Sequence, residues 1–236
     1  MQTLEKNTKG FNILELIVVV VIIGIISAAA YPKFSDWKKK REIRDTSLRI
    51  KSLILGINAQ VQRGLYSFVQ VYMNVNETTS TITIVSKGMK QSTLATKINN
   101  GDDPWNTDPA SRCDIASGTY WDDDGATAGI MEVQSMTLDR DKYTTNFVGE
   151  AAVCFSKNAQ WYSGAGVLAG GTGADATVED RIFICLRDEA VDTCAVAEDT
   201  GEPTIIEDHL YSIDWTRFGD VTMEKWSIGL NEWVLQ

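Results

Sequence analysis

One long apolar stretch dominates the beginning of the chain. Residues 16–31 read LIVVVVIIGIISAAAY and carry no charge, and extending the stretch back to Phe11 adds the polar residues Asn12 and Glu15. A helix needs about 20 apolar residues to cross the hydrocarbon core of a bilayer. We therefore expect residues 11–31 to form a helix that is long enough to span a membrane.

Two ordinary interpretations of this stretch compete. As a secretory signal peptide it would have Lys6 and Lys9 in its basic region and would be cut near Ala30. As an uncleaved anchor it would hold the chain in a membrane. Neither interpretation explains Glu15, because a carboxylate inside an apolar span costs about 2.5 to 3.5 kcal/mol and marks a specific partner.

The residues around this carboxylate resemble the N-terminal motif of type IV pilins and type II secretion pseudopilins. Gly10 ends a short basic leader, Phe11 follows it, and Glu15 is the fifth residue after that glycine, as in the family. Gly24 and Pro32 fall where the family has a helix-loosening glycine and a kinking proline. The order of helix and strands is also similar to that of H-type minor pseudopilins and FimT-like minor pilins. A major pilin of unusual size is the alternative.

The resemblance implies a processing step and an assembly step. A prepilin peptidase would cut between Gly10 and Phe11 and methylate the new N-terminus. Glu15 would then pair with the N-terminal amine of a neighbouring subunit, so that two charges that are costly in apolar surroundings compensate each other. The implied partners are other pilin or pseudopilin subunits, the peptidase, an inner-membrane assembly platform and the lipid bilayer.

The pattern after Pro32 predicts a helix followed by strands. Apolar residues recur at helical spacing as far as Leu65, Pro32 should bend the helix rather than end it, and Gly64 is typical of a helix end. Residues 217–220 are typical of a hairpin turn. Short runs rich in β-branched and aromatic residues predict strands at 66–74, 81–86, 151–155, 181–187, 209–216 and 221–227.

These elements predict an α+β pilin fold. A long N-terminal helix, with a transmembrane first half and an amphipathic second half, would pack on a C-terminal antiparallel β-sheet head. The expected segments are a cleaved leader, a transmembrane or filament-core helix, an amphipathic helix and a β-rich head, at 1–10, 11–31, 32–64 and 65–236. The chain would be a single-pass inner-membrane protein with a periplasmic head before assembly, and part of a surface pilus or periplasmic pseudopilus afterwards.

Charge is distributed unevenly along the chain. Residues 1–100 contain 14 Lys and Arg against 6 Asp and Glu, and residues 101–236 contain 8 against 26, which gives net charges of +8 and −18. The acidic part is a poor surface for phosphate backbones, so we expect no nucleic-acid partner. The basic run at 33–51 is interpreted as a solvated helix face near lipid headgroups, or as a face toward acidic heads of adjacent subunits.

The four cysteines predict two disulfides. They lack the Cys-x-x-Cys spacing of zinc ribbons, thioredoxins and iron–sulfur proteins. An even number beyond an export signal favours disulfides in an oxidising compartment, with free thiols in a reducing compartment as the alternative. Three pairings are possible, and we favour Cys113–Cys154 and Cys185–Cys194. The oxidising compartment and the resemblance predict that the head lies outside the cytoplasm. The positive-inside rule alone would predict the opposite, because the basic residues 38–41 follow the apolar stretch.

The remaining motifs do not indicate catalysis. Asp122 and Asp124, in the sequence DDDG, could ligate Ca²⁺, but a solvated acidic turn is favoured and the loop does not fit an EF-hand. No other cofactor is expected. The single histidine, His209, has no evident nucleophile partner, and the glycine-rich segment at 163–176 lacks a P-loop pattern.

The sequence thus predicts a filament subunit that is not an enzyme. It would be processed after Gly10 and would assemble through its N-terminal helix into a type IV pilus or a type II secretion pseudopilus. The alternative is an exported binding or hydrolytic protein with an ordinary signal peptide cut near Ala30.

Overall fold

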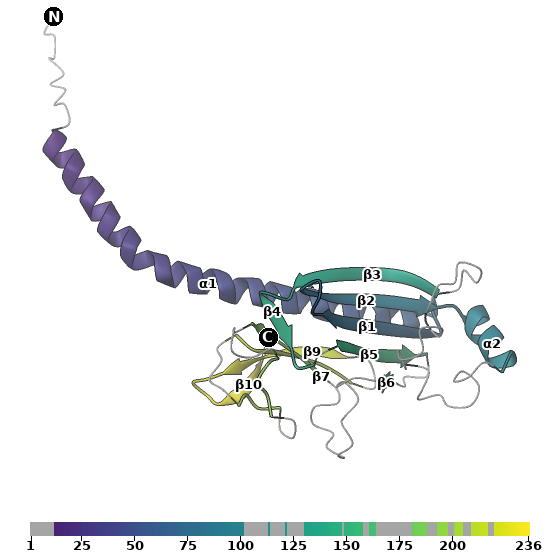
Figure 1. The fold of residues 1–236 in the computed structure, drawn as a ribbon. Coiled ribbons are helices and arrows are strands. Elements are labelled where there is room, and N and C mark those ends of the chain that lie inside the picture. The colour runs from purple at the N-terminus through teal and green to yellow at the C-terminus, as the bar shows by residue number, and fades with distance from the viewer. Residues whose placement is uncertain are drawn as a thin grey trace, which may run out of the picture. The chain divides into compact units, whose positions relative to one another are not determined.

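The computed structural model describes most of the chain (Figure 1). The described residues are 12–101, 113, 121, 130–147, 149–157, 161–163, 181–187, 193–197, 201–204, 209–216 and 220–236, without the side chains of 28–33, 130–132 and 161–163. They form two compact units, one within residues 1–42 and one within residues 43–236.

Helix α1 (Ile13–Gln62) is 50 residues long and extends through both units. The side-chain oxygen of Asn12 accepts a hydrogen bond from the backbone N–H of Leu14 at 3.2 Å, which caps the first turn. Gly64 follows the helix with φ +77°, and the N–H of Leu65 donates to the carbonyl of Gln60 at 3.0 Å. A glycine in this left-handed conformation ends helices commonly, because it lacks a Cβ atom.

Five antiparallel strands form sheet A, in the order β3-β2-β1-β5-β6. Strands β1 and β2 pair along their whole length, from Phe68 opposite Met89 to Asn76 opposite Thr81. β3 lies at one edge, and its register with β2 shifts between Ser86 and Lys87. The strands are β1 (Phe68–Asn76), β2 (Thr81–Met89), β3 (Ile130–Asp139), β5 (Gly149–Ser156) and β6 (Trp161–Ser163).

Five more antiparallel strands form sheet B, in the order β10-β9-β8-β7-β4. β8 and β9 pair as a hairpin from Tyr211 opposite Lys225 to Trp215 opposite Val221, around the predicted turn, whose residues 217–219 lie outside the description. The strands are β4 (Tyr143–Thr145), β7 (Arg181–Leu186), β8 (Tyr211–Trp215), β9 (Val221–Ser227) and β10 (Glu232–Leu235).

The main core of the second unit joins α1 to both sheets. The helix contributes apolar side chains at separations of three, four and seven residues, which places them on one face. Sheet A contributes alternate residues of β1, among them Val71 and Met73, and sheet B contributes Ile213 and Trp215. The helical residues in this core are Ile43, Ile50, Leu53, Ile54, Ile57 and Val61.

A second core cluster covers the opposite face of sheet A. Phe68, Ala152 and Cys154 point away from the main core, because successive residues of a strand face opposite sides. Helix α2 (Gln91–Asn99) packs against them through Leu94 and Ile98. Sheet A is therefore buried on both faces at this end.

The predicted pilin fold with a transmembrane first half is wrong for the residues described. None of their helices combines the length and the apolar character that crossing a membrane requires. The body also differs from the single predicted sheet, because its strands divide between two sheets.

The same finding corrects the predicted location. A single-pass inner-membrane protein needs a membrane-spanning helix, and the described part of the chain contains none.

Candidate functional site

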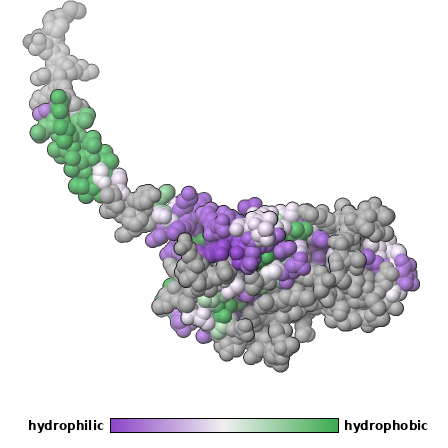
Figure 2. All heavy atoms as spheres, in the orientation of Figure 1, coloured by the Kyte–Doolittle hydropathy of each residue, from purple (hydrophilic) through white to green (hydrophobic). Residues whose placement is uncertain are grey.

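The first part of α1 exposes apolar side chains in every direction. Residues 16–23 are all large, apolar and exposed, and eight consecutive residues cover more than two helical turns. Figure 2 shows the apolar side chains of this part of α1 in green. A helix that is apolar all round needs an apolar environment, so these residues, with Ile13, Leu14, Ile25 and Ile26, form a candidate assembly segment.

Glu15 is the acidic residue of the first turn of α1, and its side chain is exposed. A carboxylate is favourable at this position, because the unpaired N–H groups of the first turn carry partial positive charge. Glu15 is also the only charged residue among the described side chains from 12 to 27. The segment therefore offers one ionic group inside an otherwise apolar surface.

The other residues predicted for processing and bending have different outcomes. Gly10 and Phe11 lie outside the described residues. Gly24 and Pro32 both lie within α1, which continues through them as a helix. A Cβ atom at Gly24 would have no neighbour within 4 Å, so packing within the subunit does not require a glycine there.

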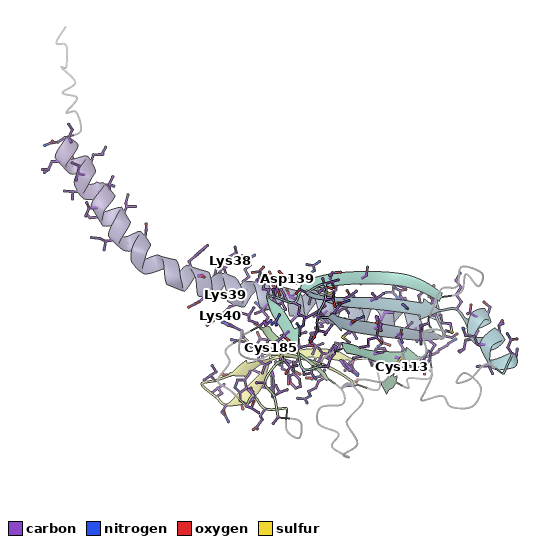
Figure 3. All side chains as sticks on the ribbon, in the orientation of Figure 1. Lys38, Lys39, Lys40, Cys113, Asp139 and Cys185 are labelled. Carbon is purple, nitrogen blue, oxygen red and sulfur yellow. A yellow bond between two sulfur atoms is a disulfide. The ribbon has the colours of Figure 1, made fainter. Side chains whose placement is uncertain are left out.

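A basic segment with two aromatic residues follows on α1. Lys38, Lys39 and Lys40, labelled in Figure 3, are exposed on successive positions of the helix. The Phe34 and Trp37 rings lie 5.8 Å apart between centroids, and both side chains are more than half exposed. The Arg41 guanidinium lies 5.6 Å from the centroid of the Trp37 ring, which is cation–π distance.

The first disulfide joins Cys113 to Cys154 of β5, with their Cα atoms 5.8 Å apart. Both cysteines are fully buried in the second core cluster. The Phe68 and Trp121 rings stack in the same cluster at 5.7 Å between centroids. This bond therefore ties residue 113 to the face of sheet A that α2 covers.

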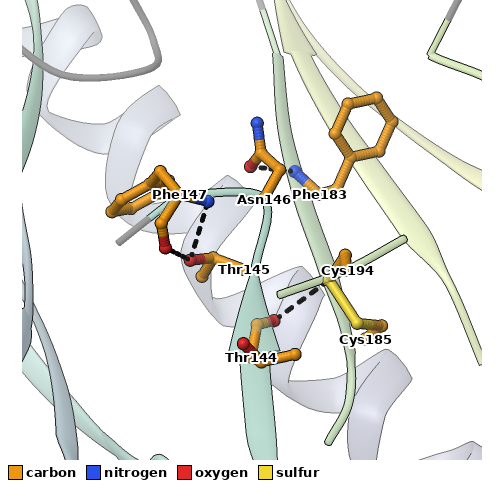
Figure 4. Close-up of a disulfide and its surroundings, with 7 residues drawn as sticks. All are labelled: Thr144, Thr145, Asn146, Phe147, Phe183, Cys185 and Cys194. Carbon is orange, nitrogen blue, oxygen red and sulfur yellow. Dashed lines mark hydrogen bonds between the residues drawn. A yellow bond between two sulfur atoms is a disulfide. The ribbon is translucent and has the colours of Figure 1, made fainter. Parts of the chain in front are cut away.

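The second disulfide joins Cys185 of β7 to Cys194 (Figure 4). The N–H of Cys194 donates to the carbonyl of Thr145 at 2.8 Å, and the Cys194 Sγ lies 3.3 Å from the carbonyl oxygen of Thr144. The N–H of Phe183 donates to the side-chain oxygen of Asn146 at 3.1 Å. The segment around Cys194 is thus fixed to β4 and β7. Both disulfides are the pairs that the sequence analysis favours.

The calcium site that the sequence offered is not part of the described structure. Asp122 and Asp124 lie outside the described residues. Among the side chains that are described, no group of three or more His, Cys, Asp or Glu residues could hold a metal ion.

A polar cluster on sheet B was missed by the sequence analysis. Arg181 of β7 lies opposite Asp214 of β8, with Nε 3.3 Å from the carboxylate, and the Ser212 hydroxyl donates to the same carboxylate at 2.6 Å. Burial raises the pKa of Asp214, and Ser212 and Arg181 oppose this rise. Burial and the charge of Asp214 also raise the pKa of Glu224, against the opposing effect of Arg181. Two carboxyl groups thus share one arginine.

A tyrosine on the opposite sheet shows a related effect. The Tyr72 hydroxyl donates to the Glu150 carboxylate at 2.6 Å, and the Asn74 amide donates to the Tyr72 oxygen at 3.1 Å. Burial and the carboxylate of Glu150 raise the pKa of Tyr72 to about 12. This contact links β1 to β5 and holds the phenol in its neutral form.

The raised pKa of Asp214 predicts a pH-dependent effect of Asp214→Asn. The Asp214 carboxyl group binds its proton more tightly in the folded chain than in the unfolded chain. The free energy of unfolding that this protonation contributes is present below the ordinary pKa of 3.8 and is lost as pH rises through the folded-state pKa. We expect the melting temperature of the variant minus that of wild type to increase as pH is raised from 3.5 to 7. Asp220→Asn, at an exposed position, is the control. A difference that falls with pH would contradict this explanation.

Comparisons with known proteins give a partial match. No family model matches the chain, and no solved structure matches it. Two curated proteins, each a fimbrial protein of Pseudomonas aeruginosa, are 30% identical to it over 59 residues. The matched region covers 25% of this chain and 38% of each relative, so the chain spans less than half the length of these relatives. The similarity supports a pilin-like relationship and assigns no subfamily.

Proposed function

We propose that this chain is a structural subunit of a pilus-type filament at the cell surface and is not an enzyme. The apolar assembly segment of α1, residues 13–26, is the observation that carries the proposal. The similarity to fimbrial proteins supports it over a quarter of the chain.

The assembly segment needs partners that cover it on every side. Burying a large aliphatic side chain contributes about 1.5 to 3 kcal/mol, and the segment exposes more than ten of them. Helices of identical subunits, packed side by side along a filament axis, would bury these side chains against one another. Such an arrangement needs no ligand or reaction.

Glu15 gives this packing a defined register. Inside a bundle of apolar helices its carboxylate would be costly unless a positive group lies beside it. The amine of a neighbouring subunit is such a group if the chain is cut after Gly10, since Phe11 is then the first residue. The pairing fixes how far one helix is displaced along the next.

The motif around Gly10 supports a more specific assignment of the filament. We propose processing by a prepilin peptidase between Gly10 and Phe11, methylation of the new N-terminus, and assembly into a type IV pilus or a type II secretion pseudopilus. The two disulfides support a body that folds in an oxidising compartment outside the cytoplasm.

The mature N-terminus tests the proposed processing. We expect mass spectrometry of the chain from sheared surface filaments to find a methylated Phe11 as the first residue. The matched sample is the same chain with Gly10→Ala, isolated from whole cells because an uncut chain should not enter filaments, and the peptidase should leave its first ten residues attached. A mature chain that begins near Tyr31 would support the exported binding or hydrolytic protein instead.

A further inference from the structure

Exposed apolar side chains of the second unit gather on α1 and on one hairpin. Six large apolar side chains described in residues 43–236 are exposed. Three of them lie on α1 or just after its end, and three lie on the hairpin of β9 and β10. Each of the two elements therefore offers apolar side chains that a partner could bury. The residues are Leu48, Leu55 and Leu65, and Ile228, Leu230 and Leu235.

A groove runs between α1 and the edge strand β3. It encloses about 230 Å³ and includes side chains of both elements. Arg49 is the charged residue that lines it, and its side chain is exposed. β3 is at an edge of sheet A among the described strands, so one side of this strand can accept a further segment. The groove is lined in part by Leu48, Arg49, Ser52, Gln134, Ser135 and Met136.

The β9–β10 hairpin has the properties of a segment that could fill such a groove. Its tip presents Ile228 and Leu230, the latter 65% exposed. Asn231 closes the turn with φ +54°, and the exposed Glu232 follows as the first residue of β10. β10 is itself at an edge of sheet B among the described strands.

The hairpin carries the charge opposite to that of the residue that lines the groove. That residue, Arg49, is basic, although the α1 residues 43–62 (net charge +2) and the β3 residues 130–139 (net charge −2) are neutral together. The hairpin, residues 221–235, contains two acidic residues and one basic residue, a net charge of −1. Opposite charges at the rim of an apolar contact select the correct partner and its orientation.

We propose that the groove between α1 and β3 receives the β9–β10 hairpin of a second copy of this chain. Leu230 enters the groove beside Leu48, and Glu232 pairs with Arg49 at its rim. The contact joins two different surfaces, so each subunit offers one of each and the assembly continues along one direction as a filament does. This inference rests on the proposed function and specifies which surfaces of the bodies meet.

Charge reversal in the full-length chain tests the contact. We expect Arg49→Glu and Glu232→Arg each to lower the amount of the chain in sheared filaments at least about tenfold, because like charges would then face each other. The double variant should recover most of the wild-type amount, because the pair is restored with reversed sign. Leu230→Ser should also lower filament content, since it removes an exposed apolar side chain that the subunit alone does not need.

Controls separate this contact from folding and from the proposed function. Lys90→Glu reverses an exposed charge at the start of α2 and should leave filament content unchanged. Single variants that assemble as well as wild type, or a double variant without recovery, would overturn the hairpin contact while the filament function stands. A wild-type chain absent from all surface filaments would instead overturn the proposed function.

Discussion

Replacing both Cys113 and Cys154 by alanine should lower the free energy of unfolding by about 4 kcal/mol. The bond closes a loop with a sequence separation of 41, and closing a loop of that length restricts the unfolded chain by about this amount. Alanine is a better replacement than serine, because both positions are fully buried among Phe68, Trp121 and Ala152. A serine hydroxyl there would be buried without a hydrogen-bond partner. Urea unfolding of the oxidised chain, compared with the double variant, measures the difference.

The second disulfide is the matched comparison. It closes a loop with a sequence separation of 9, so removing Cys185 and Cys194 together should cost about 2.5 kcal/mol by the same relation. The order of the two losses is the sharper test, since both variants replace buried cysteines with the same residue. A larger loss from the shorter loop would show that the contact of the Cys194 Sγ with the Thr144 carbonyl contributes more than loop closure.

The part of the body that the sequence predicts well is the part with strong local patterns. The helix ends near Gly64 because a glycine there can adopt the left-handed conformation. Each predicted strand segment contains or overlaps an observed strand, because runs of β-branched residues fit a buried pleated surface. The strands predicted in this way are β1, β2, β5, β7, β8 and β9, whereas β3, β4, β6 and β10 were not predicted. These signals lie within a few residues of one another and need no knowledge of the tertiary fold.

Elements that depend on distant packing were missed. Helix α2 lacks a side-chain hydrogen bond at its N-cap, and Leu94 and Ile98 are its main apolar residues. These two side chains are four residues apart and face the second core cluster, which only the folded sheet A creates. Gly88 is similar, because a Cβ atom there would meet the Tyr66 ring at 2.7 Å. Its role could not be predicted without the position of that ring.

The polar cluster of sheet B shows the same limit for the candidate sites. Arg181 and Asp214 come from strands that are far apart in the chain, and only the antiparallel register of β7 and β8 brings them opposite each other. Glu224 joins them through the register of β9, where it lies opposite Ser212. A sequence gives the residue types, but the register between strands decides which of them meet.

The transmembrane prediction failed for a related reason. It relied on the composition of residues 11–31, which satisfies the length that a bilayer requires. No described helix combines the length and the apolar character that crossing a membrane requires. An apolar segment of this kind is also typical of a helix that other helices bury.

Replacing Glu15 by alanine should lower the amount of the chain in filaments by at least about a hundredfold. Removing one partner of a buried ion pair leaves the other charge uncompensated, which costs about 3 to 5 kcal/mol, and each 1.4 kcal/mol is about tenfold in association. Glu15→Gln should be equally deficient, because it keeps the size of the side chain and removes the charge. The fraction of the chain in sheared filaments and the fraction left unassembled are measured by immunoblotting.

Asp36→Ala is the control for this loss of charge. Asp36 is an exposed carboxylate on the same helix, beyond the apolar assembly segment, so its removal should leave filament content near that of wild type. Cleavage after Gly10 should proceed in all three variants, because the substituted residues lie beyond the cut. A Glu15→Ala chain that enters filaments as well as wild type would therefore remove the carboxylate from the assembly mechanism.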